Sequence, residues 1–264
     1  HGMSFIGAPF TFGFQQLGSN CGAISSHASV DVGGIVRWMS NDAFYQFDGT
    51  VRKLPCTVED FVFDNIEPKQ LEQVYAGSNS AYGEVWWLYC TTASNQIDRY
   101  VIFNYQENLW YTGSIVRSTW IDTGTYSLPY ATKYDGSSSS TLYSHENGKD
   151  DDGSTMTSYI ESGDFDIGDG DDMMFIKRMI PDFKDQVGNV NISLKSRYYP
   201  SDTQTTKGPF YYTTSTQRLN PRTRGRQVAV RVESNGYDGS NNDATGEDWR
   251  LGTIRFEVQP DGKR

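Results

Sequence analysis

The sequence predicts an all-β protein, and three observations support that prediction. Aromatic residues make up 14% of the chain, and aromatic side chains suit the half-buried surface of a pleated sheet. Short alternating apolar runs recur about every ten residues and end at turn residues such as Asp48-Gly49. Helical periodicity is nearly absent, and the best helix candidate, residues 57–66, is stopped by Pro68.

The first half of the chain is expected to form a propeller-like β domain. Expected strands are residues 29–32, 35–39, 43–47, 51–54, 83–90, 99–105, 109–112, 130–134 and 141–144, with turns at Gly33-Gly34, Asp48-Gly49 and Asp135-Gly136. Segments 43–54, 100–113 and 130–148 share one form: an alternating strand, a polar turn and a second strand. Such repeats are typical of propeller blades, of which a ring needs about four to eight. Because the chain also opens at His1-Gly2-Met3, we expect a partial propeller whose beginning is missing.

The second half is expected to form a β-sandwich after a polar connection at residues 146–155. Expected strands are residues 158–167, 173–183, 189–199, 209–215, 226–234 and 249–258. Alternation places Val190, Ile192 and Leu194 on one face of their strand, and Val228, Val230 and Val232 on one face of theirs. The expected domains are therefore residues 1–150 and 151–264.

The net charge of −10 disfavours DNA binding over the whole surface, because an acidic protein repels phosphate. One basic cluster stands out, formed by Arg218, Arg222, Arg224 and Arg226. It is either a solvated loop or a contact for phosphate or for an acidic neighbouring subunit. No apolar stretch approaches the length that crosses a bilayer, so no membrane insertion is expected.

No catalytic set, cofactor or metal site is predicted. The three cysteines have no metal-ligand spacing, and the three histidines are scattered. The acidic run Asp164, Asp166, Asp169, Asp171 and Asp172 departs from a calcium loop, because Phe175 falls where the loop requires Glu. A solvated turn explains the run equally well, so a bound cation there stays an open alternative. Nothing singles out two of the 33 acidic residues as a glycosidase pair.

The tryptophans are expected to have structural roles. Trp38, Trp86, Trp87 and Trp110 are predicted to anchor the packing between blades, because large aromatic side chains bury extensive apolar surface. The alternative for Trp86, Trp87, Trp110 and Trp120 is an exposed position in which they stack on sugars.

Several stretches resemble a family of tail proteins from short-tailed phages. They include "WMSNDAFYQFDGTV" at residues 38–51, "EVWWLYC" at 84–90 with "DRYVIFNYQENLWYTG" at 98–113, "ESGDFDIGDGDDMMFIKRMIPDF" at 161–183 and "GEDWRLGTIRFEVQPDGKR" at 246–264. The resemblance spans most of the chain. It lies in the character of these segments and in their order along the chain, and it does not depend on one diagnostic motif. It implies a tail hub, packaged-DNA stabilisation or head-to-tail connector protein, with a propeller-like domain and a sandwich. It also implies a ring, often of six copies, around the DNA exit path, in contact with portal, adaptor or other tail proteins and with fibres or a needle.

The sequence therefore predicts a non-enzymatic structural protein of the virion, located in a phage tail or connector. In that role it would retain packaged DNA in the channel or attach tail parts. Two alternatives stay open: a carbohydrate- or receptor-binding tail module, and a polysaccharide-cleaving enzyme.

Overall fold

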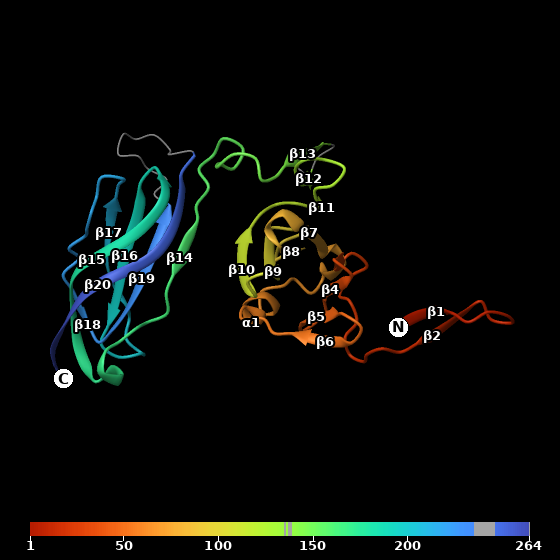
Figure 1. Ribbon diagram of the computed structural model, residues 1–264, viewed down its shortest axis with the longest axis horizontal. Helices are drawn as coiled ribbons and strands as arrows, with labels where there is room; N and C mark the ends of the chain where they lie inside the picture. Colours follow the sequence, from red (N-terminus) through yellow and green to blue (C-terminus); the bar gives the residue numbers. More distant parts are fainter. Residues whose placement is uncertain (135, 137–138, 235–245, 264) are drawn as a thin grey trace. The chain divides into compact units, whose positions relative to one another are not determined.

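The computed structural model describes residues 1–134, 136, 139–234 and 246–263. Strands hold 52% of the residues and helices 6%, which confirms the all-β prediction. All strand pairs among the described residues are antiparallel. The chain divides into two compact units, His1–Asn147 and Gly148–Arg264 (Figure 1). The expected domain boundary lies at 150/151, three residues further on.

Unit 1 contains a hairpin and three sheets that follow one another along the chain. The hairpin pairs β1 (Gly2–Phe5) with β2 (Phe12–Gln15). The sheets are β3 (Ser29–Val32), β4 (Ile35–Met39), β5 (Phe44–Phe47) and β6 (Val51–Leu54); β7 (Tyr75–Asn79), β8 (Glu84–Tyr89), β9 (Arg99–Asn104) and β10 (Leu109–Ser114); and β11 (Thr119–Ile121), β12 (Tyr130–Tyr134) and β13 (Ser140–Ser144). In each sheet, strands adjacent in the chain are paired. The three repeated segments are therefore the hairpins β5–β6, β9–β10 and β12–β13, one in each sheet.

The expected helix is shorter in the structure than in the sequence prediction. It appears as α1 (Glu59–Phe63), with two short 3₁₀ turns at Leu71–Gln73 and Ser80–Tyr82 further along the chain. The Asn65 side chain donates to the Phe61 carbonyl at 2.7 Å and satisfies one of the carbonyls left open at the helix end. The helix therefore ends before Pro68 is reached.

Strand β8 is buried on both faces and lies between two cores. Val85, Trp87 and Tyr89 belong to a core shared with β3–β6 and α1. The alternate residues Trp86 and Leu88 belong to a second core, shared with β11 and β12. Because side chains alternate across a strand, consecutive residues of β8 join the middle sheet to the sheets on either side.

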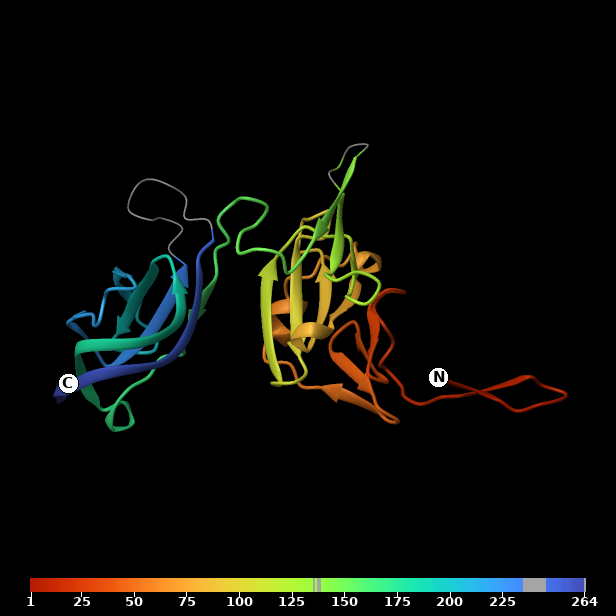
Figure 2. The same ribbon diagram turned by 45° about the horizontal axis from the view of Figure 1, so that its top comes forward.

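The hairpin β1–β2, which we call the N-terminal arm, projects away from the three sheets of its unit (Figures 1 and 2). Met3 is paired with Phe14, and Phe5 with Phe12. These four side chains share one face of the ribbon and are all exposed, by 49% to 73%. The arm therefore presents an apolar face that no other described part of the chain covers.

Unit 2 consists of two sheets that share one core. One sheet contains β14 (Tyr159–Glu161), β16 (Val190–Arg197), β17 (Thr205–Tyr212) and β19 (Gln227–Ser234), in the order β14-β19-β16-β17; the other contains β15 (Asp172–Val187), β18 (Thr223–Gly225) and β20 (Asp248–Lys263), in the order β18-β15-β20. The inward side chains of β16 and β19 pack in one core with those of β15. Val190, Ile192 and Leu194 share the inward face of β16, as their alternation predicts. A short 3₁₀ turn at Gly168–Gly170 leads into β15.

The predicted length of the strand at residues 158–167 is wrong, because the strand in the structure is much shorter. Only Tyr159–Glu161 pairs continuously with β19, and Phe165 returns to Val228 as an isolated bridge. Between them, Ser162 and Gly163 leave the ladder, although the Ser162 amide and hydroxyl still bond to Val230. A glycine with no neighbouring side chain around it weakens a strand interior, which accounts for the break.

The hairpin turn at Gly49 is a direct test of the predicted β5–β6 unit. Gly49 has φ +110°, and a Cβ added there meets no atom within 4 Å, so a substitution costs backbone energy without a clash. We expect Gly49→Val to lower the free energy of unfolding by about 1 kcal/mol or more. Thermal denaturation measures this loss. Gly163→Val is the control, because Gly163 has open space and no positive φ, and an equal loss in both variants would contradict the assignment. Of the second predicted turn, Asp135 lies outside the described residues and Gly136 has φ +72°.

An ion-pair group holds the edge strand β14 to its sheet. Lys195 Nζ lies 2.7 Å from Glu161, and Arg231 Nη1 lies 3.1 Å from the same carboxylate. The hydrogen bond from Lys195, with that from Arg231, holds the pKa of Glu161 below its ordinary value.

Glu161→Gln is expected to destabilise the chain in a pH-dependent way. A depressed carboxyl pKa stabilises the fold above the unfolded value, near 4.3, and the stabilisation is lost as pH falls through the folded pKa. Since the Glu161 side chain is 27% exposed, solvent screening limits the loss to about 1 kcal/mol at pH 7. Denaturant titrations between pH 7 and pH 3 should show the difference from wild type shrinking towards zero. The exposed Glu72 of unit 1 supplies the control variant Glu72→Gln, and a difference independent of pH would count against the ion pair.

Candidate functional site

Two tryptophans predicted as packing anchors join the middle sheet to the first. Trp87 is fully buried, and its Nε1 donates to the Ala28 carbonyl at 3.0 Å. Trp110 donates to the Pro55 carbonyl at 2.9 Å, and its ring centroid lies 4.8 Å from that of Phe44. Each side chain therefore bonds to backbone outside its own sheet, on the side of β3–β6.

Trp86 joins the middle sheet to the third, together with Trp120. The two rings stack with centroids 4.7 Å apart, and both side chains are at least nine-tenths buried. Trp120 Nε1 donates to the Ser78 carbonyl at 2.7 Å. A Cβ on Gly77 would lie 2.5 Å from the Trp120 ring, so the missing side chain allows this close approach. Because Trp86, Trp87 and Trp120 are buried, the interpretation of these three as sugar-stacking platforms is wrong.

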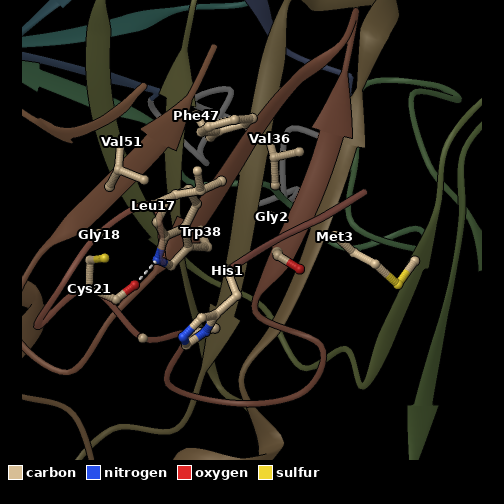
Figure 3. Close-up of a pocket in the computed structure, with 13 residues that line it drawn as sticks. His1, Gly2, Met3, Leu17, Gly18, Cys21, Val36, Trp38, Phe47 and Val51 are labelled. Atoms are coloured by element: carbon tan, nitrogen blue, oxygen red, sulfur yellow. Dashed lines mark hydrogen bonds between the residues drawn. The ribbon is translucent and has the colours of Figure 1, made fainter. Parts of the chain in front are cut away.

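Trp38 has a different position from the other three predicted anchors. It lies on the face of β4 opposite the core, stacks on Tyr45 with centroids 5.8 Å apart, and donates to the Cys21 carbonyl at 2.7 Å (Figure 3). There it lines a hollow of about 600 Å³. We call this cavity the N-terminal hollow. Its wall consists of His1, Gly2, Met3, Leu17, Gly18, Cys21, Gly22, Ala23, Ser29, Val36, Trp38, Phe47 and Val51.

The four arginines of the basic cluster do not form one cationic face. Arg222 comes directly before the edge strand β18 and Arg224 lies on it; both are exposed, while Thr223 between them is buried. Arg224 Nε lies 2.5 Å from Asp261, which offsets its charge. The Arg226 guanidinium lies over the Tyr199 ring at 5.2 Å, and Arg218 is exposed beside the buried Leu219. Arg218 and Arg222 are therefore the members of the cluster with the clearest access to an outside anion.

The acidic run does not converge on one point. Asp164 bonds to Arg197 and accepts from Gln204 at 3.2 Å, whereas Asp171 and Asp172 face Lys263. Among the described residues no group of three or more histidine, cysteine or acidic side chains is arranged to hold a metal ion. No helix of the described chain is both long and apolar enough to span a membrane.

The structure brings together a carboxylate pair that the sequence did not single out. Asn79 Nδ2 donates to Glu146 Oε1 at 2.9 Å and to Glu84 Oε2 at 3.4 Å. Glu84 also accepts from Tyr111 at 2.6 Å and from Trp86 Nε1 at 2.9 Å. Burial is the main cause that raises the pKa of Glu146. These residues lie on β7, on β8, on β10 and just after β13. No spacing in the sequence therefore indicates that Glu84 and Glu146 form a pair.

A scan against models of protein families and a search of curated proteins both find no match for this chain.

Proposed function

We propose that this chain is a structural subunit of a bacteriophage tail or head-to-tail connector, assembled as a ring around the DNA exit channel. This class of protein is proposed because the sequence resembles tail proteins of short-tailed phages. The three sheets of unit 1 would be successive blades of a partial propeller, and the two sheets of unit 2 a β-sandwich. The observation that carries the proposal is the N-terminal arm, whose apolar face projects into solvent, as expected for an assembly contact.

The packing of unit 1 supports a scaffold role. Trp86, Trp87 and Trp120 are held inside by ring contacts and by hydrogen bonds to Glu84 and to backbone carbonyls. Large aromatic side chains that join two sheets make unit 1 rigid, and because they are buried their rings cannot contact a ligand. In a ring, Arg218 and Arg222 would face a phosphate or an acidic neighbour, while the net charge of −10 would keep passing DNA from adhering.

The test is the location of the chain in phage particles. Particles are purified from the strain that carries the coding sequence, and the chain is sought by mass spectrometry and by immunogold electron microscopy. We expect several copies per particle, label at the tail or the vertex beneath it, and a ring with a central channel in views down the tail axis. Absence of the chain from purified particles would overturn the proposal.

A polysaccharide-cleaving enzyme is the second candidate, and the Glu84–Glu146 pair is the observation that favours it. A carboxyl with a raised pKa beside a second carboxylate is the arrangement of a general acid and its partner in glycoside hydrolysis. The assay is the release of reducing sugars from bacterial surface polysaccharides.

On the structural proposal, no release is expected from the wild-type chain or from any variant. Release of sugar that is abolished in Glu146→Gln and retained in the control Glu161→Gln, a variant of unit 2, would establish the enzyme instead. Binding on a glycan array without release would indicate a carbohydrate-binding module.

A further inference from the structure

The N-terminal arm is amphipathic, and its exposed apolar face is suited to being buried against another surface. Met3, Phe5, Phe12 and Phe14 occupy one face, while Ser4 and Gln15 lie on the other. The Phe5 and Phe12 rings meet edge to face, with centroids 6.2 Å apart. With Phe10 at the tip, 70% exposed, the phenylalanines alone expose on the order of 500 Å². That equals the largest apolar patch of an ordinary monomer, although a two-stranded hairpin is only marginally stable by itself.

The arm also lacks the charges that protect exposed strands. No Asp, Glu, Lys or Arg occurs before Asp31, in a chain of which 21% is charged. Exposed edge strands normally carry charged side chains, lysine above all, which prevent pairing with other chains. A ribbon that is both apolar and uncharged is suited to lie against a second uncharged surface.

The N-terminal hollow is such a surface. Its wall holds no acidic side chain and no lysine or arginine, and Val36, Trp38, Phe47 and Val51 form its floor on the outer face of β3–β6 (Figure 3). Its volume of about 600 Å³ lies in the range that accepts a drug-sized apolar ligand, about 300–1,000 Å³. The N-terminal hollow therefore has room for aromatic side chains.

We propose that the N-terminal arm of one copy occupies the N-terminal hollow of a second copy of this chain. The arm does not fill its own hollow, because its root at Gly2 and Met3 is part of the hollow's wall, and the ribbon leads away from there (Figures 2 and 3). Both complementary surfaces belong to the same polypeptide. Two copies related by a twofold axis therefore make two equal contacts.

The available area suits a stable dimer. Two arms that each bury on the order of 500 Å² remove about 1,000 Å² from solvent, and the surface that they cover on the partner adds to this, against the 1,200–2,000 Å² of a standard interface. A twofold exchange closes at two copies, whereas the same arm-to-hollow contact made head to tail is the kind of junction that a ring needs. The inference rests on the proposed function only for its biological purpose.

The first experiment measures the mass of the 264-residue chain by sedimentation velocity over a range of concentrations. Wild type is expected to form dimers or larger assemblies. The triple variant Phe5→Ser, Phe12→Ser and Phe14→Ser is expected to weaken association by roughly a hundredfold or more, because each phenylalanine loses its apolar burial. Its circular dichroism should be unchanged, since all three side chains are exposed. The control is Leu142→Ser, at a side chain 63% exposed on β13, and it should associate as wild type does.

The second variant fills the hollow. Gly22 lies in the wall, has no positive φ, and offers open space around an added Cβ. Gly22→Trp is therefore expected to weaken association as strongly as the arm variant does. Gly163→Trp, at an equally open glycine of unit 2, should leave association unchanged.

Mixing the two defective proteins decides between an arm-to-hollow and an arm-to-arm contact. The Gly22→Trp chain keeps an intact arm, and the triple variant keeps an intact hollow, so their mixture is expected to form a heterodimer with one good contact. Failure of the mixture to associate, or a wild-type chain that stays monomeric at all concentrations, overturns the inference. Self-association by a chain that is absent from phage particles would instead refute the proposed function and leave the arm contact standing.

Discussion

Replacing Trp87 with alanine is expected to lower the free energy of unfolding of unit 1 by about 3–5 kcal/mol, because a fully buried large aromatic leaves a cavity that the surrounding strands cannot close. Trp87 has no exposed surface, and its ring centroid lies 4.9 Å from that of Phe44 on the neighbouring sheet. The substitution also leaves the Ala28 carbonyl without its indole donor. Both the apolar contact and the hydrogen bond between the first two sheets are lost together.

Amide hydrogen exchange read by mass spectrometry locates this loss. Protection should fall in β3–β6 and β7–β10 and stay unchanged in β14–β20, since the units have separate cores. Trp87→Phe should recover part of the stability by filling most of the cavity. Tyr159→Ala, at a side chain 61% exposed, is the control and should cost less than about 1 kcal/mol. An equally small effect of Trp87→Ala would show that the two sheets do not depend on this contact.

Arg37 is expected to respond in opposite ways to two substitutions. Its side chain is 5% exposed and lies over the Tyr105 ring at 4.9 Å and the Phe103 ring at 5.9 Å. Among the described residues its Nε and Nη1 have no hydrogen-bond partner, and burial lowers the pKa of the guanidinium. Arg37→Met keeps the bulk and removes a buried charge, so the free energy of unfolding should stay within about 1 kcal/mol of wild type or rise.

Arg37→Glu should destabilise unit 1 by about 3–5 kcal/mol, because it buries an unpaired anion against the negative faces of two aromatic rings. Urea denaturation measures both variants. Arg52→Glu reverses a charge that is 61% exposed on the adjoining hairpin and should cost at most about 1 kcal/mol. A loss of more than 2 kcal/mol in Arg37→Met would mean that the cation contributes more than the packing of its stem, contrary to this account.

Local sequence chemistry predicted many of the strands and failed at identifiable places. Strands of β-branched and aromatic residues, such as β4 and β8, were predicted at or within a residue of their observed bounds. Strand β7 was missed because its sequence, YAGSN, has low strand propensity. It is a strand because β8 pairs with it and because Gly77 admits the Trp120 ring. The N-terminal arm was also missed, since Gly2 and Gly13 interrupt its alternation.

The candidate sites were harder to predict than the strands. The alternation of Trp86 and Trp87 predicts that they face opposite ways, but not which sheet each one meets. The pairing of Glu84 with Glu146 depends on Asn79, which lies on a third segment of the chain. The basic cluster was visible as a run of arginines, whereas its division between Asp261, Tyr199 and solvent was not.

The sequence by itself determined the all-β class, the main hairpins and the face on which each strand residue lies, because the period of two and the turn residues act over a few neighbouring positions. Tertiary structure alone decided which faces are covered. It buried Trp86, Trp87 and Trp120 between sheets, left Trp38 over a hollow, and exposed the apolar face of the arm. The physical reason is that a strand's own sequence sets the direction of its side chains, whereas burial requires a second surface from a distant part of the chain or from another molecule.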